Sequence, residues 1–276
     1  MTGRRALVWW AFVGLVGASA YLVDLGGLHI PHIGDEAPYV QITRLTAESG
    51  RLLPLRAPPG LENTKPPLLF WLGIASTDGG RAFTLLRLRL PIVLFTFLTG
   101  VLVFAVTRRL AGAPGPAFVA ALSFLAFWTT FQYGRPFLTN PPETFFVFLP
   151  FGAALMDARR LDRWGFWVLA GLSVGVAALF KSFALVVPVA FAFLLWALAR
   201  RKGRVRDVLR LDVPKGALAL VLALACFALW PLLDPDPQSI LAHFVWKENV
   251  GKIGGGGYLR GLLSGRHGVW TTLLGP

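Results

Sequence analysis

Charged side chains able to carry acid–base and anion-binding chemistry occur in several short polar segments between long apolar runs. They are Asp35, Glu36, Lys65, Arg135, Glu143, Lys181, Glu248 and Lys252. Carboxylates can take up and release protons, and lysine and arginine side chains bind anions such as phosphate. If folding brings these segments together, the set predicts one site in which an acid works beside a bound anion.

The first polar segment carries a pair of acids, Asp35 and Glu36, followed by Tyr39. From Tyr39 onward the apolar residues recur at helical spacing, which predicts an amphipathic helix on the membrane surface that begins near the acids. A purely structural interpretation makes Asp35 the helix N-cap and Glu36 a first-turn acid that the helix dipole favours. The alternative places both acids in a functional site, and the segment alone leaves the two interpretations open.

Four further candidates can also be weighed between a structural and a functional interpretation. Lys65 and Lys181 could each snorkel toward the lipid head groups, or could bind a lipid phosphate. Asn140 or Thr139 could cap the next helix, and Glu143 would then lie at or near its third position, as in a capping box. Arg135 has no structural task that is visible in the sequence.

The remaining polar residues give weaker signals. Glu248 and Lys252 are four residues apart, so a helix would place them on one face as a surface ion pair. The histidines lack compact metal-ligand spacing; they are His29, His32, His243 and His267. A metal site is therefore possible but unsupported, and no cofactor is expected. The phosphate-loop patterns GxxxxGK[ST] and GxGxxG are absent from the sequence, which argues against a nucleotide-driven pump.

The composition indicates what kind of protein must position these groups. Of the 276 residues, 55% are hydrophobic and only 15% are charged, against about 25% charged in a soluble domain. The formal charge of +13 comes from cations clustered between apolar runs, as in the cytoplasmic loops of membrane proteins rather than on a nucleic-acid-binding face. The single cysteine, Cys226, excludes an intramolecular disulfide. The sequence therefore predicts an all-α polytopic membrane protein with no nucleic-acid partner.

About seven apolar runs are predicted to cross the membrane as helices. They are residues 7–25, 86–106, 116–131, 145–156, 164–180, 183–199 and 217–233. With the N-terminus in the cytoplasm, the basic loops after the second, fourth and sixth runs all face the cytoplasm, and the site residues face outward. The segment Ala18-Ser19-Ala20 also resembles a signal-peptide cleavage site, but the apolar run continues to Leu25 and favours an uncleaved anchor.

We expect the chain, residues 1–276, to form a single transmembrane domain. Residues 28–81 are predicted to be a first outer loop with interfacial helices, because the apolar stretch 67–75 is too short to span a membrane. Residues 234–276 are predicted to be a second outer loop and the beginning of a further helix. The sequence shows no fixed-period or inverted repeat.

Four motifs occur in the order and spacing of a known family. They are Asp35-Glu36-x-x-Tyr39; KPPLLFW at residues 65–71; GLSVGVAALFK at 171–181; and KENVGKI at 247–253. The last three resemble the patterns KPPLxYW, GLxxGLALLTKG and EHxxRF. The chain thus resembles the N-terminal part of the GT-C membrane glycosyltransferases. It is most similar to the group that holds the lipid A aminoarabinose transferases and the bacterial relatives of the protein O-mannosyltransferases.

This resemblance implies a GT-C fold and an enzyme that moves a hexose or pentose from a polyprenyl-phosphate donor, with inversion. The acceptor would be a hydroxyl of a lipid, glycan or protein at the outer face of the plasma membrane. Asp35 would be the general base, with Glu36 in the same catalytic group. The substrate-binding residues implied are Tyr39, Lys65, Arg135, Glu143, Lys181, Glu248 and Lys252.

Two alternatives stay open at this point. One is a transporter or lipid-binding membrane protein with a polar vestibule on its outer side. Transporters usually place their charges near the middle of the membrane and often contain repeats, whereas these charges lie at the outer boundary. The other alternative is a truncated and inactive homologue of the glycosyltransferases.

Overall fold

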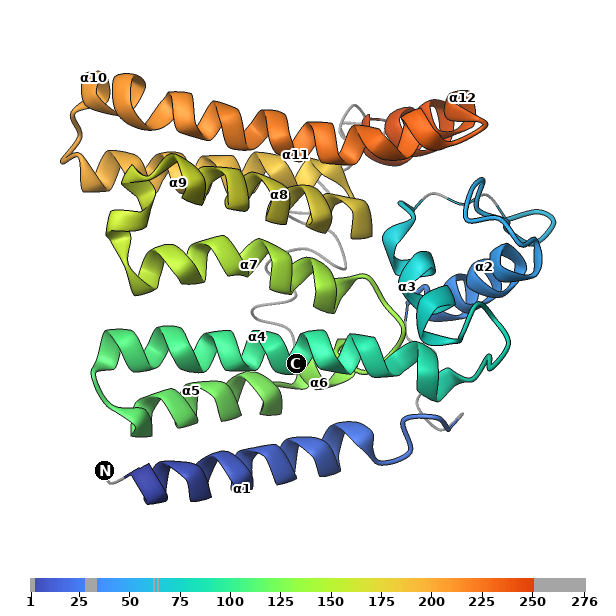
Figure 1. Ribbon diagram of the computed structural model, residues 1–276, viewed down its shortest axis with the longest axis horizontal. Coiled ribbons are helices and arrows are strands. Elements are labelled where there is room, and N and C mark those ends of the chain that lie inside the picture. Colours follow the sequence, from blue (N-terminus) through green and yellow to red (C-terminus); the bar gives the residue numbers. More distant parts are fainter. Residues whose placement is uncertain (1–2, 28–33, 62, 64, 251–276) are drawn as a thin grey trace, which may run out of the picture.

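The computed structural model describes residues 3–27, 34–61, 63 and 65–250, and every regular element within them is a helix. Seven rods run alternately in opposite directions through an elongated bundle (Figure 1). They are α1 (Gly3–Leu22), α4 (Leu85–Ala111), α5 (Pro114–Ala126) continued by α6 (Trp128–Tyr133), α7 (Asn140–Met156), α8 (Trp164–Phe180), α9 (Val186–Arg200) and α11 (Val213–Leu233).

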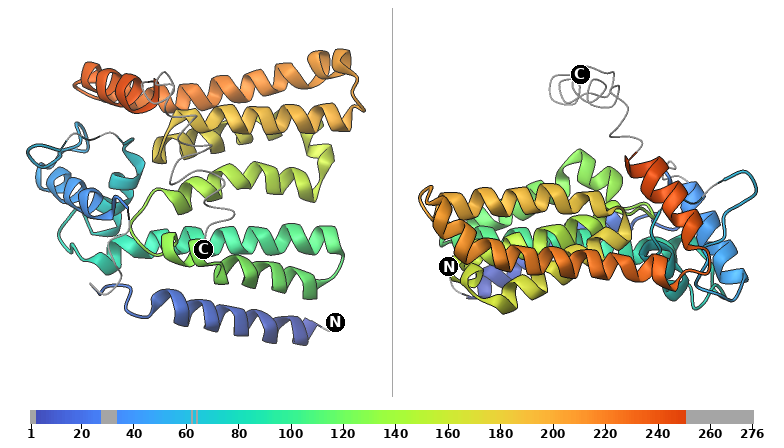
Figure 2. Two further views of the ribbon diagram at one scale, coloured as in Figure 1. Left: turned by 180° about the vertical axis from the view of Figure 1, so that it is seen from behind. Right: turned by 90° about the horizontal axis from the view of Figure 1, so that it is seen from above.

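The shorter elements lie at the two ends of the rods. Helices α2 (Glu36–Glu48) and α3 (Leu68–Ser76) pack together at one end, called here the α2/α3 end (Figures 1 and 2). The last elements, α12 (Pro237–Ser239) and η4 (Ile240–Val250), follow α11 on this side. At the opposite end are η1 (Ala158–Asp162), α10 (Val205–Asp207) and η3 (Val208–Asp212), while η2 (Phe183–Leu185) joins α8 to α9. The opposite end is called the arginine end, after Arg108, Arg109, Arg159, Arg160, Arg200 and Arg201.

Each predicted apolar run coincides with one rod, and the helices expected within residues 28–81 correspond to α2 and α3. Their position at the membrane interface stays a prediction. Among the residues that the structure describes, three stretches are long and apolar enough to cross a membrane: Leu85–Ala111, Phe183–Arg200 and Val205–Leu233. Ala11–Leu22, Pro114–Ala126 and Trp164–Phe180 are apolar but shorter. The number of crossings therefore stays a prediction. Large apolar side chains are exposed along the rods, with Leu169 at 70% and Val187 at 72%, as expected of a surface that faces lipid.

Two details differ from the sequence-based expectation. The third predicted run is not one helix, because the backbone is extended at Phe127 and separates α5 from α6. The fourth run begins earlier than predicted, at Asn140, and tolerates prolines there because the first turn of a helix has no hydrogen bond for them to break. The predicted capping box at this point is wrong, since Thr139 is the N-cap and no side chain caps the helix.

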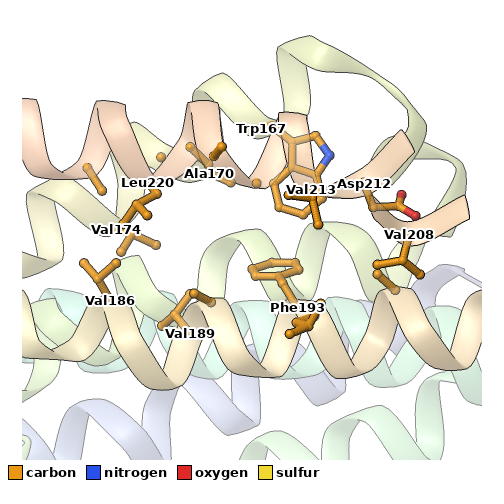
Figure 3. Close-up of a pocket in the computed structure, with 18 residues that line it drawn as sticks. Trp167, Ala170, Val174, Val186, Val189, Phe193, Val208, Asp212, Val213 and Leu220 are labelled. Carbon is orange, nitrogen blue, oxygen red and sulfur yellow. The ribbon is translucent and has the colours of Figure 1, made fainter. Parts of the chain in front are cut away.

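The motif at residues 171–181 has a packing role. A Cβ atom added to Gly171 would lie 2.5 Å from the carbonyl oxygen of Ala219, and one added to Gly175 would lie 2.6 Å from the Cβ of Cys226. The glycines therefore let α8 approach α11 closely, as small residues do between membrane helices. Helix α9 lies across an apolar cavity of about 280 Å³ from this pair, lined by side chains such as Phe193, with Asp212 at one end (Figure 3).

Candidate functional site

The predicted general base, Asp35, lies at the first residue before α2. Asp35 therefore occupies the N-cap position, as the structural interpretation expects, but its carboxylate accepts no capping hydrogen bond from a backbone N–H of that helix. Instead, the hydroxyl of Tyr39 donates a hydrogen bond of 3.0 Å to Oδ2 of Asp35. Tyr39 is buried and Asp35 is exposed. The tyrosine therefore orients a carboxylate that stays open to the outside of the α2/α3 end.

The neighbouring acid, Glu36, is fully buried in a bidentate ion pair with Arg89 of α4, and both side chains are 0% exposed. Arg89 Nε lies 2.7 Å from Oε1 of Glu36, and Nη2 lies 2.9 Å from Oε2. Arg89 Nη1 also donates to the carbonyl oxygens of Leu25 and Gly27. The backbone N–H of Phe137 donates to Oε1 of Glu36 at 2.7 Å. This pair thus joins the segment after α1, the start of α2, α4 and the loop before α7.

Arg89 was not among the candidates predicted from the sequence. Its signal was a cation inside the apolar run 86–106, where a charge is costly and usually has a purpose. Because both oxygens of Glu36 have buried partners, its contacts fit a positioning role. By fixing the first turn of α2, the pair fixes the adjacent Asp35.

Two separately predicted residues, Glu143 and Lys181, form one ion pair. Glu143 Oε2 at the start of α7 lies 3.2 Å from Lys181 Nζ at the end of α8. The lysine side chain is 42% exposed and the carboxylate 19%. Lys181 therefore has both a partner that directs it and a face open to an external anion.

Arg135 has structural contacts that could not be seen in the sequence. Its guanidinium donates to the carbonyl oxygens of Tyr21, at 3.3 Å, and Val23, at 2.7 Å, and lies 4.8 Å above the ring of Phe131. Partial burial, reinforced by the positive charge of Arg89, lowers the pKa of Arg135, although an arginine remains a cation at neutral pH. Arg135 thus binds the end of α1 and places positive charge at the α2/α3 end.

Lys65 belongs to a short turn that leads into α3. Its backbone N–H donates to Oδ1 of Asn63 at 3.1 Å, and Nδ2 of Asn63 donates to its carbonyl oxygen at 2.9 Å. One turn into α3, Trp71 Nε1 donates to the carbonyl oxygen of Leu52 at 2.9 Å. These bonds order the segment that carries Lys65, whose side chain is half-buried.

One hydrophobic cluster brings these segments together. It contains a residue at, or within five positions of, each described site residue: Tyr39, Phe70, Phe137, Phe146 and Phe180. Tyr39 meets Phe70 edge to face with ring centroids 5.8 Å apart, and the ring of Phe146 stacks on that of Phe180 at 6.1 Å. The cluster therefore draws Asp35, Lys65, Arg135 and the Glu143–Lys181 pair to the same end of the bundle.

The last two predicted residues are not placed by the structure. Glu248 falls in η4, where its side chain is not described, and Lys252 lies outside the described residues. Their predicted pairing therefore stays a prediction. Within the part of the chain that the structure describes, no group of three or more His, Cys, Asp or Glu residues could hold a metal ion.

The family model described as dolichyl-phosphate-mannose-protein mannosyltransferase matches residues 64–230, which is more than half of the chain. The chain belongs to this family. Family membership and the apolar rods together identify an integral membrane protein. The matched region contains Lys65, Arg135, Glu143 and Lys181, whereas the acids at the start of α2 precede it.

Curated relatives cover most of this chain. The undecaprenyl phosphate-alpha-4-amino-4-deoxy-L-arabinose arabinosyl transferase of Pseudomonas savastanoi pv. phaseolicola is 28% identical over 249 residues, which are 86% of this chain and 43% of the relative. The protein of that name numbered 1 from Sodalis glossinidius is 30% identical over 259 residues, covering 90% of this chain and 44% of the relative. The chain thus spans less than half the length of these relatives.

Solved structures show the same fold. ArnT from Cupriavidus metallidurans in the apo state matches with a TM-score of 0.65 and 21% identity, over 95% of this chain and 48% of that protein. The same protein bound to undecaprenyl phosphate matches with a TM-score of 0.60 and 23% identity, over 87% and 44% of the two chains. The predicted GT-C-like fold class is confirmed.

Proposed function

We propose that this family member transfers a sugar from a polyprenyl-phosphate donor to an acceptor hydroxyl, with Asp35 as general base and inversion at the anomeric carbon. The observation that carries the proposal is the gathering of an exposed, oriented carboxylate and several cations on one hydrophobic cluster. A relative named for a sugar on undecaprenyl phosphate supports the donor class.

In this reaction Asp35 takes the proton of the acceptor hydroxyl as its oxygen attacks the anomeric carbon. The bond from that carbon to the phosphate oxygen breaks on the opposite face, which inverts the configuration. Tyr39 supports the base, because its hydroxyl holds one carboxylate oxygen and leaves the other available. Glu36 and Arg89 act as positioning residues through the start of α2.

Negative charge grows on the phosphate as it departs, and cations placed beside it stabilise the transition state. Lys65 and Lys181 are the described candidates for this role, and Arg135 adds positive charge nearby. Lys252, and Glu248 as a group that orients a cation or hydroxyl, complete the proposed set. The phosphate binds without a nucleotide or a metal in this scheme.

We place the site on the outer side of the plasma membrane, with the N-terminus in the cytoplasm. The support is the position of the short basic loops, because the arginine end collects them and such loops usually face the cytoplasm. The α2/α3 end then faces outward, where a lipid-linked sugar and an envelope acceptor meet.

The test is release of undecaprenyl phosphate from labelled undecaprenyl-phosphate sugars by the reconstituted protein, with lipid, glycan and peptide acceptors. Asp35→Asn should lower turnover at least about a hundredfold, since loss of a general base costs about 10²–10⁴. Asp78→Asn is the matched control, because Asp78 is an exposed acid in the turn after α3 and asparagine tolerates its positive φ of 55°.

Normal turnover by Asp35→Asn, with Asp78→Asn also normal, would reject Asp35 as the base. Turnover by the wild type with an unchanged anomeric configuration would reject the direct displacement. If wild-type protein transfers none of the sugars offered but retains undecaprenyl phosphate, the chain binds the lipid without performing the reaction, and the proposal fails.

A further inference from the structure

A second cavity lies between α4, the α5–α6 rod and α7. Its volume is about 240 Å³. Its polar lining comes from Thr96, Thr99, Thr129, Thr130, Tyr133, Asn140 and Thr144. None of the described residues that line it carries a charge. The sequence analysis gave these residues no role, and the proposed reaction does not use them.

The polar side chains that line this cavity can form further hydrogen bonds. The hydroxyl of Thr96 donates to the carbonyl oxygen of Gly134 at 2.9 Å, and that of Thr99 to the carbonyl oxygen of Phe95 at 2.9 Å. Their lone pairs remain available, because a hydroxyl donates one proton and accepts two bonds. Within the described residues, the side chains of Thr130 and Thr144 have no hydrogen-bond partner.

The cavity exists because the third rod is interrupted. The extended backbone at Phe127 ends α5, and the turn that closes α6 leaves room only for glycine at position 134. A Cβ there would lie 2.4 Å from the carbonyl oxygen of Thr130 and 2.9 Å from Oγ1 of Thr96. Phe127 and Trp128 beside the break are 65% and 69% exposed. The break thus opens a polar recess next to aromatic side chains that face lipid.

The recess lies at membrane depth. Thirteen residues of α4 separate Thr96 from Arg109 at the arginine end, which is about 20 Å at the helical rise of about 1.5 Å per residue. The hydrocarbon core is about 30 Å thick, so the cavity falls within the half nearer the α2/α3 end. Hydroxyl and amide groups at such depth need polar partners.

We propose that this cavity binds the neutral, hydroxyl-rich head group of a membrane glycolipid. A phosphate or an ammonium head group would enter without a counter-charge, which is costly in a low-dielectric site. A single water needs only about 10–15 Å³ of such volume, so the cavity has room for a much larger group. Hydroxyls and an amide match the donors and acceptors of a sugar, and the rings of Tyr133 and Phe124 cover its apolar face.

The inference goes beyond the proposed function, because binding at this cavity requires no sugar transfer. It is tested with purified full-length protein in detergent and three lipids with identical acyl chains. Radiolabelled monoglucosyl diacylglycerol is displaced by unlabelled monoglucosyl diacylglycerol, diacylglycerol or phosphatidylglycerol. We expect the glucosyl lipid to bind at least tenfold more tightly than either of the other two.

The variants separate hydrogen bonding from shape. Thr130→Val with Thr144→Val keeps the volume but removes two hydroxyls, and should weaken glucosyl-lipid binding about tenfold. Thr130→Ser with Thr144→Ser keeps the hydroxyls and should bind within about twofold of wild type. Thr107→Val, on the same α4 helix but outside the cavity lining, should bind as wild type does.

Equal affinity of wild type for the glucosyl lipid and diacylglycerol would overturn the proposal, as would undiminished binding by the valine pair. A serine pair as weak as the valine pair would show a packing effect and would also overturn it. Asp35→Asn should leave this binding unchanged, so failure of the transfer mechanism and failure of the glycolipid site are distinguishable.

Discussion

The two ends of the bundle hold their charged groups in opposite ways. At the α2/α3 end, one arginine and one glutamate, Arg89 and Glu36, are completely buried and bind each other through two hydrogen bonds. At the arginine end, Arg200 and Arg201 share two aspartates, and one of these, Asp162, is 52% exposed. The first arrangement is a single pair and the second is a network.

The network is redundant where the pair is not. Asp212 accepts from Arg200 and from Arg201, each at 2.9 Å, and Asp162 also accepts from both arginines. Loss of one member leaves each remaining charge with a partner. Loss of either Arg89 or Glu36 leaves the other as a buried charge without a counter-ion, next to the candidate base Asp35. The comparison therefore predicts that the end carrying the proposed chemistry is the one less tolerant of substitution.

The largest effect is expected for Arg89→Met. The variant leaves Glu36 buried without its counter-ion, and breaking such a pair costs about 3–5 kcal/mol of unfolding free energy. Unfolding of the detergent-solubilised protein with increasing denaturant, followed by tryptophan fluorescence, measures the loss. Combining Arg89→Met with Glu36→Gln should recover part of the lost stability, since the buried charge is then gone. A double variant less stable than Arg89→Met alone would contradict this account.

Substitutions in the network at the arginine end should lower the unfolding free energy by less than Arg89→Met does, and by different amounts at the two aspartates. Asp212 is 4% exposed at its side chain, so Asp212→Asn should lower the unfolding free energy by about 1–3 kcal/mol through weaker charge-assisted bonds. Asp162→Asn should cost less than about 1 kcal/mol, because that side chain is 52% exposed and its interactions are screened. The same unfolding measurement ranks the two, and equal losses would show that exposure does not set the difference.

Much of this architecture was predictable, because apolar length alone sets the positions of membrane helices. The seven predicted runs fall on the seven rods. The interruption at Phe127 was not predicted, since its flanking residues are apolar and contain neither glycine nor proline.

The sequence predicted which residues belong to the candidate site better than it predicted which of them pair with one another. Asp35, Lys65 and Arg135 stood out as charges between apolar runs, but a sequence does not show which acid pairs with which base. Glu143 was assigned to a capping box, whereas it pairs with Lys181 across two helices. Arg89 lay inside an apolar run and was counted as part of it. Pairings across 38 or 53 positions depend on tertiary packing.

The Glu143–Lys181 pair should affect activity far more than stability. Its partly exposed lysine makes the contribution of the ion pair to unfolding free energy less than about 1 kcal/mol. Lys181→Met should nevertheless raise the KM for a polyprenyl-phosphate donor at least about tenfold, since a charge-assisted bond to phosphate is lost. Lys202→Met, an exposed lysine at the arginine end, is the control. Unchanged donor KM in Lys181→Met would leave snorkelling as the role of this lysine.

The smallest effect is expected at Asp157, which is half-buried at the arginine end and is the N-cap of η1. Its carboxylate accepts from the backbone N–H of Arg159 at 3.1 Å and from Nε of Arg159 at 3.3 Å. The backbone bond is the main cause of a pKa below the usual value of this carboxyl, and the bond to Nε adds to it. A carboxyl whose pKa is depressed by folding stabilises the protein above its unfolded pKa of about 3.9 and loses that contribution only as the pH falls below it. Asp157→Asn keeps a capping oxygen, so its melting temperature should match that of wild type and the match should hold from pH 8 to pH 5. A difference that grows between those pH values would show that another titrating group, rather than Asp157 with Arg159, governs this turn.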